Sequence, residues 1–506
     1  MITLDLSLEN LYRQYYRCRR NKRNTVNALR FEADQERQLI RLREQLLRRT
    51  YRPGRSVCFF TTRPKLREIF AADFRDRVVH HLLVDYLERI WEPVFIHDSY
   101  ACRPGKGVHR GVTRLQQFLR QVTANGTRRA WYLQLDVANY FMSMDREILY
   151  RLLAARMTDE AALWLTGVLV FHDCTENHLM RGRSDLLARI PPHKTLFGAA
   201  PGKGMPIGNL NSQFFANVYL NSLDQFVKHE LKCRHYLRYC DDFVLLANSP
   251  EQLVDWRQRI GKFLREELAL EFNPRQQLAP VASGVDFLGY IVRRDYLLVR
   301  RRVVGHLRER LRDFEQRLVT PLAGGVRYAF DQPVLDELAA TLASYLGHLR
   351  WAASWRLWHA IWERFDFLGQ YFTFDPERMR LERRYAVPGG FRRVRDQYHW
   401  FRRRFPGDVL FFQVGSFCEF YGGLDEVVIR QLRLNSMGAN HRGARFGFPL
   451  SRSDEFSGRL RGFVPSVLVI GEQDRSPAQV QTRLPVARMV WPADPKPAAA
   501  AQLGCR

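Results

Sequence analysis

The chain has 506 residues, of which 46% are hydrophobic and 13% aromatic, so it can bury the cores of several domains and is not a disordered protein. Its formal net charge of +26 predicts a polyanionic partner, with nucleic acid as the default, although an arginine-rich background composition would also raise it. No apolar run reaches the roughly 18 residues of a membrane span and no signal-peptide pattern is present, so we expect a cytoplasmic protein without membrane contact.

The eight cysteines are scattered along the chain and form no Cys-x-x-Cys pair. This spacing argues against a zinc ribbon and against a disulfide framework. It is typical of a protein that works in a reducing compartment.

Residues 1–56 are expected to form a basic helical extension. Apolar residues recur at intervals of three and four between Ser7 and Thr50, and arginines fill the intervening positions. The basic face is either a solvated surface or an arm that faces nucleic acid. The turn-forming stretch "YRPGRS" (51–56) ends this region.

Residues 57–295 alternate short β-rich runs with helices. "WYLQLDVANYF" (131–141) and "YLRYCDDFVLLA" (236–247) are typical of neighbouring strands, and residues 209–231 between them are typical of a helix. "VDFLGYIVRRD" (285–295) predicts a further strand and hairpin. From about 300 to 375 the pattern is helical.

The remaining sequence predicts a second module. "VPGGFRR" (387–393) reads as a linker, residues 394–492 have an α/β pattern, and the low-complexity stretch 493–506 is expected to be a disordered tail. The fold class is therefore predicted as α+β, with a small mixed α/β domain at the end.

Three aspartates stand out chemically. Asp241 and Asp242 interrupt an apolar run, and Asp136 ends the other predicted strand. Buried carboxylates need a cation nearby, which is either a structural Lys or Arg or a metal ion. Three carboxylates on neighbouring strands suit Mg²⁺, and two such ions can clamp the attacking and leaving oxygens of a phosphoryl transfer.

These residues resemble the palm of a reverse transcriptase, with Tyr239–Asp242 matching that family's YxDD box. The resemblance extends from about residue 10 to 375 through blocks at 63–83, 95–119, 206–221, 285–290 and 343–357. It implies a right-hand polymerase with fingers and palm in 57–295 and a helical thumb in 296–386. It also implies an RNA template, dNTPs and a cDNA duplex as partners.

The resemblance implies a role for each matching residue. Asp136, Asp241 and Asp242 would be catalytic and would hold two Mg²⁺ ions with the carbonyl of Val137. Phe141 would be a steric gate against ribonucleotides, or else an ordinary core residue. Tyr239 and Cys240 would lie at the primer end. Triphosphate charge would be neutralised by basic residues of the fingers, with Lys65 and Arg103 favoured among Arg63, Lys65, Arg67 and Arg103.

The stretch "PIGNLNSQ" departs from the common QGxxxSP form of this family. Ile207 precedes Gly208, and Gln213 stands where proline is usual. This form resembles the reverse transcriptases of diversity-generating retroelements, which make errors opposite adenine and usually employ a small basic accessory protein. Replacing an amide by an apolar group should lower discrimination between bases.

Three other functions are alternatives to this interpretation. An antiphage defence reverse transcriptase stays open, because some of those enzymes also vary in this box. A group II intron maturase is disfavoured, since no Cys-rich endonuclease module follows. A non-catalytic RNA-binding scaffold would have little use for three buried carboxylates.

Residues 394–492 resemble the N-terminal mismatch-reading domain of the mismatch-repair protein MutS. The family's Phe-x-Glu motif is matched by Phe417 and Glu419 after the turn at Gly415, and residues 446–473 resemble the continuation of that domain. The resemblance implies that Phe417 stacks on a mispaired base and that Glu419 hydrogen-bonds to it. The alternative is a core Phe beside a surface Glu.

Overall fold

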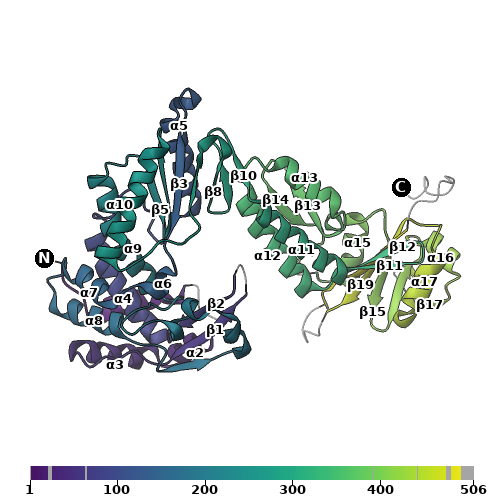
Figure 1. The fold of residues 1–506 in the computed structure, drawn as a ribbon. Helices are drawn as coiled ribbons and strands as arrows, with labels where there is room; N and C mark the ends of the chain where they lie inside the picture. The colour runs from purple at the N-terminus through teal and green to yellow at the C-terminus, as the bar shows by residue number, and fades with distance from the viewer. Residues whose placement is uncertain are drawn as a thin grey trace. The chain divides into compact units, whose positions relative to one another are not determined.

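The computed structural model describes residues 2–20, 25–62, 65–375, 377–389, 391–440, 443–473 and 480–491 (Figure 1). The chain divides into two compact units, residues 1–296 and 297–506. Arg63 and the expected tail at 493–506 lie outside the described residues. Among the residues described, no helix is both long enough and apolar enough to cross a membrane.

The first unit mixes helices with short strands. Its helices are α1 (Leu8–Arg19), α2 (Val26–Glu32), α3 (Gln35–Leu47), α4 (Phe74–Trp91), α5 (Val108–Val122), α6 (Tyr140–Ser143), α7 (Arg146–Ala154), α8 (Glu160–Phe171), α9 (Leu210–Gln225) and α10 (Pro250–Leu268). Its strands are β1 (Ser56–Thr61), β2 (Arg67–Ala71), β3 (Trp131–Asp136), β4 (His178–Met180), β5 (Tyr236–Tyr239), β6 (Asp242–Ala247), β7 (Gln277–Pro280), β8 (Val285–Phe287) and β9 (Tyr290–Val292).

An antiparallel sheet of order β5-β6-β3-β7 is the framework of the first unit. Helix α10 packs against β3 and β6, and α5 packs against β5 and β6. The two helices lie on either side of the sheet in Figure 1. Phe243–Leu246 of β6 are buried along both faces, which is why this strand reads as a continuous apolar run.

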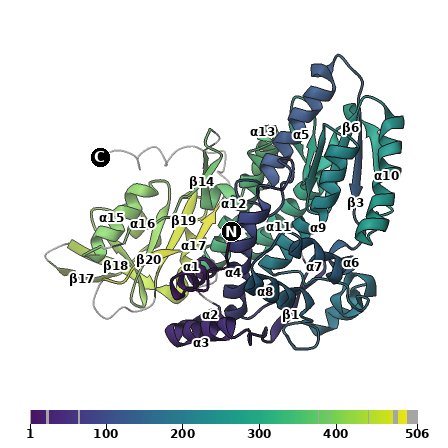
Figure 2. The same cartoon turned by 90° about the vertical axis from the view of Figure 1, so that its left-hand side faces the viewer.

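The basic extension forms the helices that the sequence predicts. Helix α1 packs against α3 and α4, and Figure 2 shows α1–α3 gathered at one end of the unit. Leu11 and Tyr15 of α1 enter the same core as Val78 of α4 and Phe215 of α9. The extension is therefore part of the folded unit and not a free arm.

The second unit begins at β10 (Leu297–Val299) and has one large sheet. Its helices are α11 (Arg301–Leu318), α12 (Gln332–Leu349), α13 (Trp355–Arg364), α14 (Leu368–Tyr371), α15 (Val394–Arg404), α16 (Glu426–Leu432) and α17 (Ser453–Arg459). Its further strands are β11 (Val319–Leu322), β12 (Gly325–Ala329), β13 (Phe372–Asp375), β14 (Arg380–Arg383), β15 (Val409–Val414), β16 (Phe417–Tyr421), β17 (Ser436–Asn440), β18 (Gly443–Pro449), β19 (Ser466–Glu472) and β20 (Arg483–Val490).

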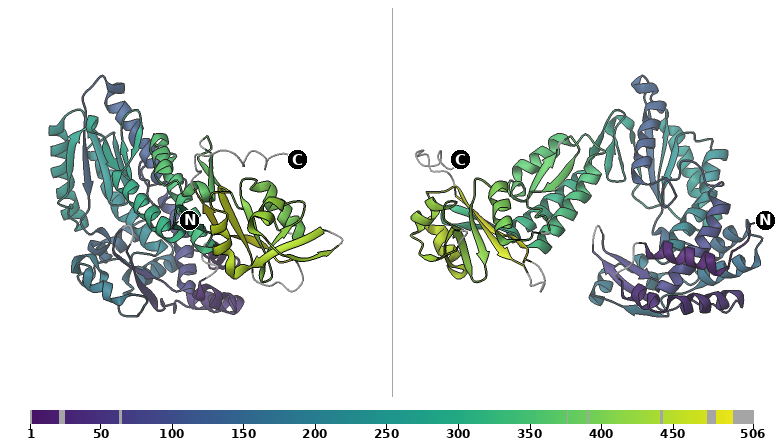
Figure 3. Two further views of the ribbon diagram at one scale, coloured as in Figure 1. Left: turned by 90° about the vertical axis from the view of Figure 1, so that its right-hand side faces the viewer. Right: turned by 180° about the vertical axis from the view of Figure 1, so that it is seen from behind.

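The large sheet of the second unit has the order β11-β12-β20-β19-β15-β16-β18-β17 and a core on each face (Figure 3). Leu410, Phe412 and Leu468 point into the core made with α11–α15. Phe411 and Val467 point the other way, into the core made with α16 and α17. This alternation follows from the two-residue period of a strand.

The helical pattern predicted from about 300 to 375 did not include the strands found at 319–329. That stretch is the β11–β12 hairpin, and β12 pairs with β20 near the end of the chain. Val, Thr and Tyr favour strands and the Gly324–Gly325 pair supplies the turn, a local signal that the helical pattern on either side masked. The expected thumb and C-terminal modules therefore share one sheet.

Candidate active site

The three aspartates gather at one end of the four-stranded sheet. Asp136 is the last residue of β3 and lies opposite Asp242, the first residue of β6. Asp241 lies in the two-residue turn between β5 and β6, and its carbonyl accepts a hydrogen bond of 3.3 Å from the backbone N–H of Val137. The turn is made possible by Cys240, which adopts a left-handed conformation with φ of 57°.

Two of these carboxylates repel each other. Burial and, after it, the charge of Asp241 raise the pKa of Asp136 to about 6, against the opposing effects of Asn273 and Lys65. The amide nitrogen Nδ2 of Asn273 donates to Asp136 at 3.1 Å, and its backbone N–H donates to the Asp136 carbonyl at 2.7 Å. This arrangement favours a cation between the carboxylates.

The third carboxylate is held separately. The Nε2 group of Gln134 donates to Asp242 at 3.1 Å, and Gln134 lies two residues before Asp136 on the same face of β3. Among the residues described, no three His, Cys, Asp or Glu side chains converge on a ready-made metal cage. The neighbouring carboxylates of Asp136 and Asp241 fit Mg²⁺, which binds through one or two carboxylates and completes its shell with water and substrate phosphates.

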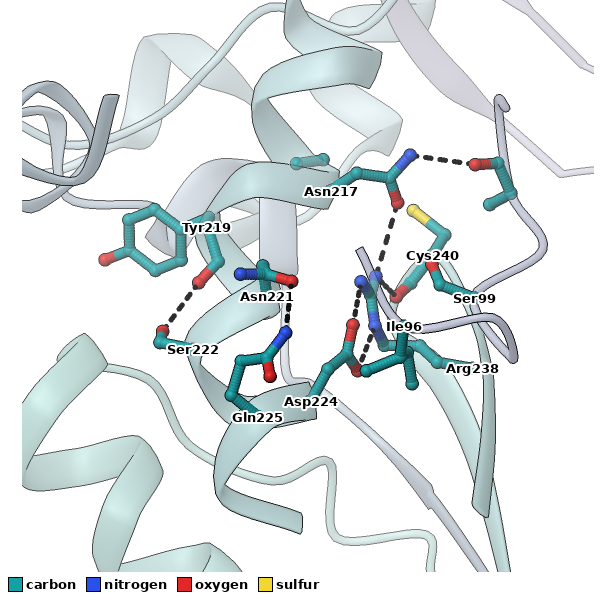
Figure 4. Close-up of polar contacts among 12 residues, drawn as sticks. Ile96, Ser99, Asn217, Tyr219, Asn221, Ser222, Asp224, Gln225, Arg238 and Cys240 are labelled. Atoms are coloured by element: carbon teal, nitrogen blue, oxygen red, sulfur yellow. Dashed lines mark hydrogen bonds and ion pairs between the residues drawn. The ribbon is translucent and has the colours of Figure 1, made fainter. Parts of the chain in front are cut away.

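A fully buried ion pair lies behind the turn between β5 and β6 (Figure 4). Arg238 of β5 pairs with Asp224 of α9 through two hydrogen bonds of 2.8 and 2.6 Å, and neither side chain is exposed. The remaining nitrogen of Arg238 donates to the carbonyl of Cys240 at 2.9 Å and to Oδ1 of Asn217 at 3.3 Å. The guanidinium therefore ties the turn that carries Asp241 to helix α9.

This pair was missed from sequence, although a signal was present. Arg238 stands in an apolar strand directly before Tyr239, and Asp224 stands in the apolar part of a helix predicted to lie beside that strand. Opposite charges in two buried neighbouring elements indicate an ion pair. Asn273 and Gln134 gave no such signal, because loop and strand amides are common.

The residues expected around the nucleotide fall into one apolar cluster. Phe141 and Ile207 are both half-buried and pack against the same core, which includes Phe70. The carbonyl of Ile207 accepts a hydrogen bond of 2.9 Å from the N–H of Phe70. Gly208 has φ of 122°, and a Cβ there would lie 2.9 Å from the Phe70 carbonyl oxygen, so the turn requires glycine.

The basic residues expected at the triphosphate differ in placement. Lys65 is exposed, and its charge lowers the pKa of Asp136, which puts it within electrostatic reach of the site. Arg67 is exposed at the start of β2. The side chain of Arg103 is 6% exposed and pairs with Glu92 at 2.9 Å while donating to the carbonyls of Ile96 and Ser99. In this arrangement the guanidinium of Arg103 is engaged by internal partners, and its contact with a triphosphate stays a prediction.

Gln213, Tyr239 and Cys240 are the remaining residues expected at the site, and all three lie in the first unit. Gln213 is exposed in the first turn of α9, and its backbone N–H bonds to the Asn209 carbonyl. Tyr239 and Cys240 are half-buried beside the aspartates. Burial, followed by the charge of Asp241, raises the pKa of the Cys240 thiol, so this cysteine is not a reactive thiolate.

The Phe-x-Glu motif of the second unit splits into an exposed and a buried residue. Phe417 starts β16 after the turn at Gly415 and is 37% exposed. Glu419 is only 5% exposed, pairs with Arg445 at 3.3 Å and accepts a hydrogen bond from Tyr421. The Glu419 carboxylate is thus engaged inside the module, and its hydrogen bond to a base stays a prediction.

Comparison with known proteins defines the class. The family model described as reverse transcriptase (RNA-dependent DNA polymerase) matches residues 61–292, which contain the aspartates, the β5–β6 hairpin and α9. The chain therefore carries a reverse transcriptase domain and is an RNA-directed DNA polymerase, a class that copies template RNA from dNTPs and generally uses a divalent metal. The residues beyond 292 lie outside this match.

Several individual proteins are similar to this chain in sequence. The chain is 27% identical to protein YkfC of Escherichia coli (strain K12) over 334 residues, which cover 59% of this chain and 82% of YkfC. It is 23% identical to the group II intron-encoded protein LtrA of Lactococcus lactis subsp. cremoris over 338 residues, 53% of this chain and 51% of LtrA.

A third relative is an uncharacterized 91 kDa protein in the cob intron of Schizosaccharomyces pombe (strain 972 / ATCC 24843), 27% identical over 180 residues. The match covers 35% of this chain and 19% of that protein. The chain thus spans about half of LtrA and about a fifth of this relative. The chain is thus related to group II intron reverse transcriptases, whereas the prediction that it is not an intron maturase stays a prediction.

Proposed function

We propose that the protein makes cDNA from a template RNA with relaxed discrimination between bases, as a diversity-generating retroelement would require. The observation that carries the proposal is Ile207. Its side chain is half-buried against the same cluster as Phe141, at the turn that opens α9. An apolar group at that position cannot form the polar contact that an amide would make to the incoming nucleotide.

The catalytic assignment follows from the electrostatics of the aspartates. Asp136 and Asp241 would hold two Mg²⁺ ions, with the carbonyl of Val137 and the nearby Asp242 contributing. When bound, the ions supply the clamp on the attacking and leaving oxygens of the phosphoryl transfer. The protein contributes orientation: Asn273 and Gln134 hold the carboxylates, and Lys65 offers a positive charge beside them.

Sequencing of cDNA made from one defined RNA tests the proposal. We expect wild-type errors to concentrate opposite adenine. Because one net hydrogen bond contributes about 0.5–1.5 kcal/mol, Ile207→Gln should lower that error rate about 2- to 12-fold. Ile207→Leu, which stays apolar, is the matched control and should keep the wild-type error spectrum. A low, uniform error rate in the wild-type enzyme would refute the proposal.

A second candidate is an intron-type reverse transcriptase of ordinary fidelity. It is favoured by the names of two relatives, LtrA and the protein in the cob intron. The same sequencing separates the two candidates, because an intron-type enzyme has no need of errors directed to one template base. An antiphage defence enzyme is a third candidate, and it would also make errors that are not directed to one base. Phage challenge of cells that carry either the active or the Asp241→Asn protein tests this candidate.

For residues 394–492 we propose a sensor of distorted duplex that uses Phe417 alone. Its ring is 37% exposed at a hairpin end, where it could wedge into a base step. Phe417→Ala should reduce the preference of the full chain for a mismatched over a matched duplex. Equal affinity of the wild-type protein for both duplexes would remove this role.

A further inference from the structure

We propose that the first unit has a second nucleic-acid site, a pocket that binds a single-stranded segment away from the catalytic aspartates. The pocket has a volume of about 790 Å³ and is lined by residues of the first unit. We call it the arginine pocket. The residues that define it are Arg128, Arg129, Trp131, Arg293, Arg294 and Tyr296.

The arginine pocket lies at the opposite end of the sheet from the active site. Trp131 is the first residue of β3 and pairs with Ala247, the last residue of β6, and with Pro280, the last residue of β7. Asp136 lies five residues further along β3. At about 3.3 Å per residue, the two sites are separated by roughly 17 Å along the strand. A ligand in this pocket is therefore distinct from the reacting primer end.

The charge of the pocket is unbalanced. Arg294 pairs with Asp295 at 2.8 Å and donates to the carbonyl of Asn125. Arg293 donates to the carbonyls of Ala282 and Ser283, which hold its guanidinium without cancelling its charge.

The other two arginines add to this excess. Arg128 and Arg129 are exposed, and neither has a carboxylate partner among the residues that the structure describes. Four positive charges thus face one negative charge in a concave site, which focuses the potential on an anion.

The aromatic rings in the arginine pocket indicate which class of anion it binds. Tyr296 is 43% exposed, and the guanidinium of Arg293 lies 6.0 Å from the centre of its ring. Trp131 is half-buried in the same lining. A positively charged groove with exposed rings is the arrangement by which proteins hold single strands, with bases on the rings and phosphates on the cations. An acidic peptide would use the cations but not the ring of Tyr296.

Fluorescence anisotropy on the full chain tests the proposal. The protein is first saturated with an unlabelled blunt template–primer duplex, and labelled 12-residue oligo(U), oligo(dT) and an abasic strand of equal length are then titrated. Arg128→Gln with Arg129→Gln should weaken binding of all three at least tenfold. It should also reduce the slope of log Kd against log salt by about 1.4, because two phosphate contacts are lost.

A tyrosine variant isolates the base contact. Tyr296→Ala should weaken binding of oligo(U) or oligo(dT) about 5- to 150-fold and leave the abasic strand unchanged. Whichever of oligo(U) and oligo(dT) binds more tightly identifies the strand as RNA or DNA. Primer extension on a template–primer with a short 5′ template overhang should not change in either variant, which separates failure of this site from failure of the catalytic centre.

The control removes the same charge elsewhere. Lys262→Gln with Arg265→Gln takes two exposed cations from α10 and should leave the affinities near those of the wild type. An equal loss in this control and in the arginine variant would mean that only net charge matters, and would overturn the site. Unchanged affinity in the arginine variant, or an equal loss of the abasic strand in Tyr296→Ala, would overturn it as well.

Discussion

Asp224→Asn should destabilise the first unit strongly, because it leaves the guanidinium of Arg238 buried with no opposing charge. Both side chains of this pair are 0% exposed and are joined by bonds of 2.8 and 2.6 Å. Breaking one partner of a buried pair costs about 3–5 kcal/mol, a large share of the roughly 5–15 kcal/mol that stabilises a typical domain. The free energy of unfolding is measured by urea denaturation with tryptophan fluorescence.

The matched control is an exposed pair in the same unit. Arg183 and Asp185 are joined at 2.6 Å, but their side chains are 71% and 57% exposed. Asp185→Asn makes the same chemical change, and we expect it to leave the denaturation midpoint where it is, because exposed pairs are screened by water. A similar loss in both variants would refute the assignment of Arg238 as a buried structural charge.

A double variant separates stability from positioning. Asp224→Asn with Arg238→Met removes both charges and keeps an acceptor for the hydroxyl of Tyr236, which donates to Asp224 at 2.7 Å. Stability should largely return. Activity should not, because the bond from Arg238 to the Cys240 carbonyl is gone and the turn carrying Asp241 is no longer held.

The size of that activity loss follows from the bond that is removed. A hydrogen bond from a charged group contributes about 1.5–3 kcal/mol, so kcat should fall about 10- to 150-fold while KM for dNTP changes little. Recovery of kcat together with stability would show that Arg238 only supports the fold.

Three further predictions concern single residues. The pKa of Asp136 is raised from 3.8 to about 6, so the metal-free protein loses stability as the pH rises through this interval and carries the full loss above about pH 6. Asp136→Asn should therefore raise the unfolding midpoint more at pH 8 than at pH 5, and Mg²⁺ should raise only the wild-type midpoint. Phe141→Ala should increase ribonucleotide incorporation in primer extension without a comparable loss of dNTP use, and unchanged sugar selectivity would mean that Phe141 is only a core residue. Glu419→Ala should lower the thermal unfolding midpoint of the second unit, because it leaves Arg445 unpaired, whereas Phe417→Ala should not. A lower midpoint in Phe417→Ala than in Glu419→Ala would contradict the burial of Glu419.

Local patterns predicted the elements that carry the chemistry. The strand ending at Asp136, the hairpin around Asp241 and the helix over 209–231 all follow from apolar periods of two and of three to four. The β11–β12 hairpin did not, because its identity depends on a partner strand more than 150 positions further along the chain. Short apolar runs have no fixed conformation until such a partner is present.

The second limit of the sequence is that it does not show which charged side chains are free to contact a ligand. Arg103 and Glu419 were expected to face substrate, and both turn inward to a charge from another part of the chain, Glu92 and Arg445 respectively. A charged residue in a motif can bind a ligand or pair with another residue of the chain, and the sequence of the motif is the same in both cases. Only the distances decide between the two.

The sequence by itself determined the class of chemistry, since three carboxylates at the ends of two predicted strands, in an arginine-rich chain, admit few uses other than metal-assisted work on phosphates. Tertiary structure decided how those carboxylates are held. It brought Asp224 under Arg238, Asn273 beside Asp136 and the ring of Tyr296 beside Arg293. The first two of these contacts join separate elements, and their energies depend on burial and distance, which exist only once the chain has folded.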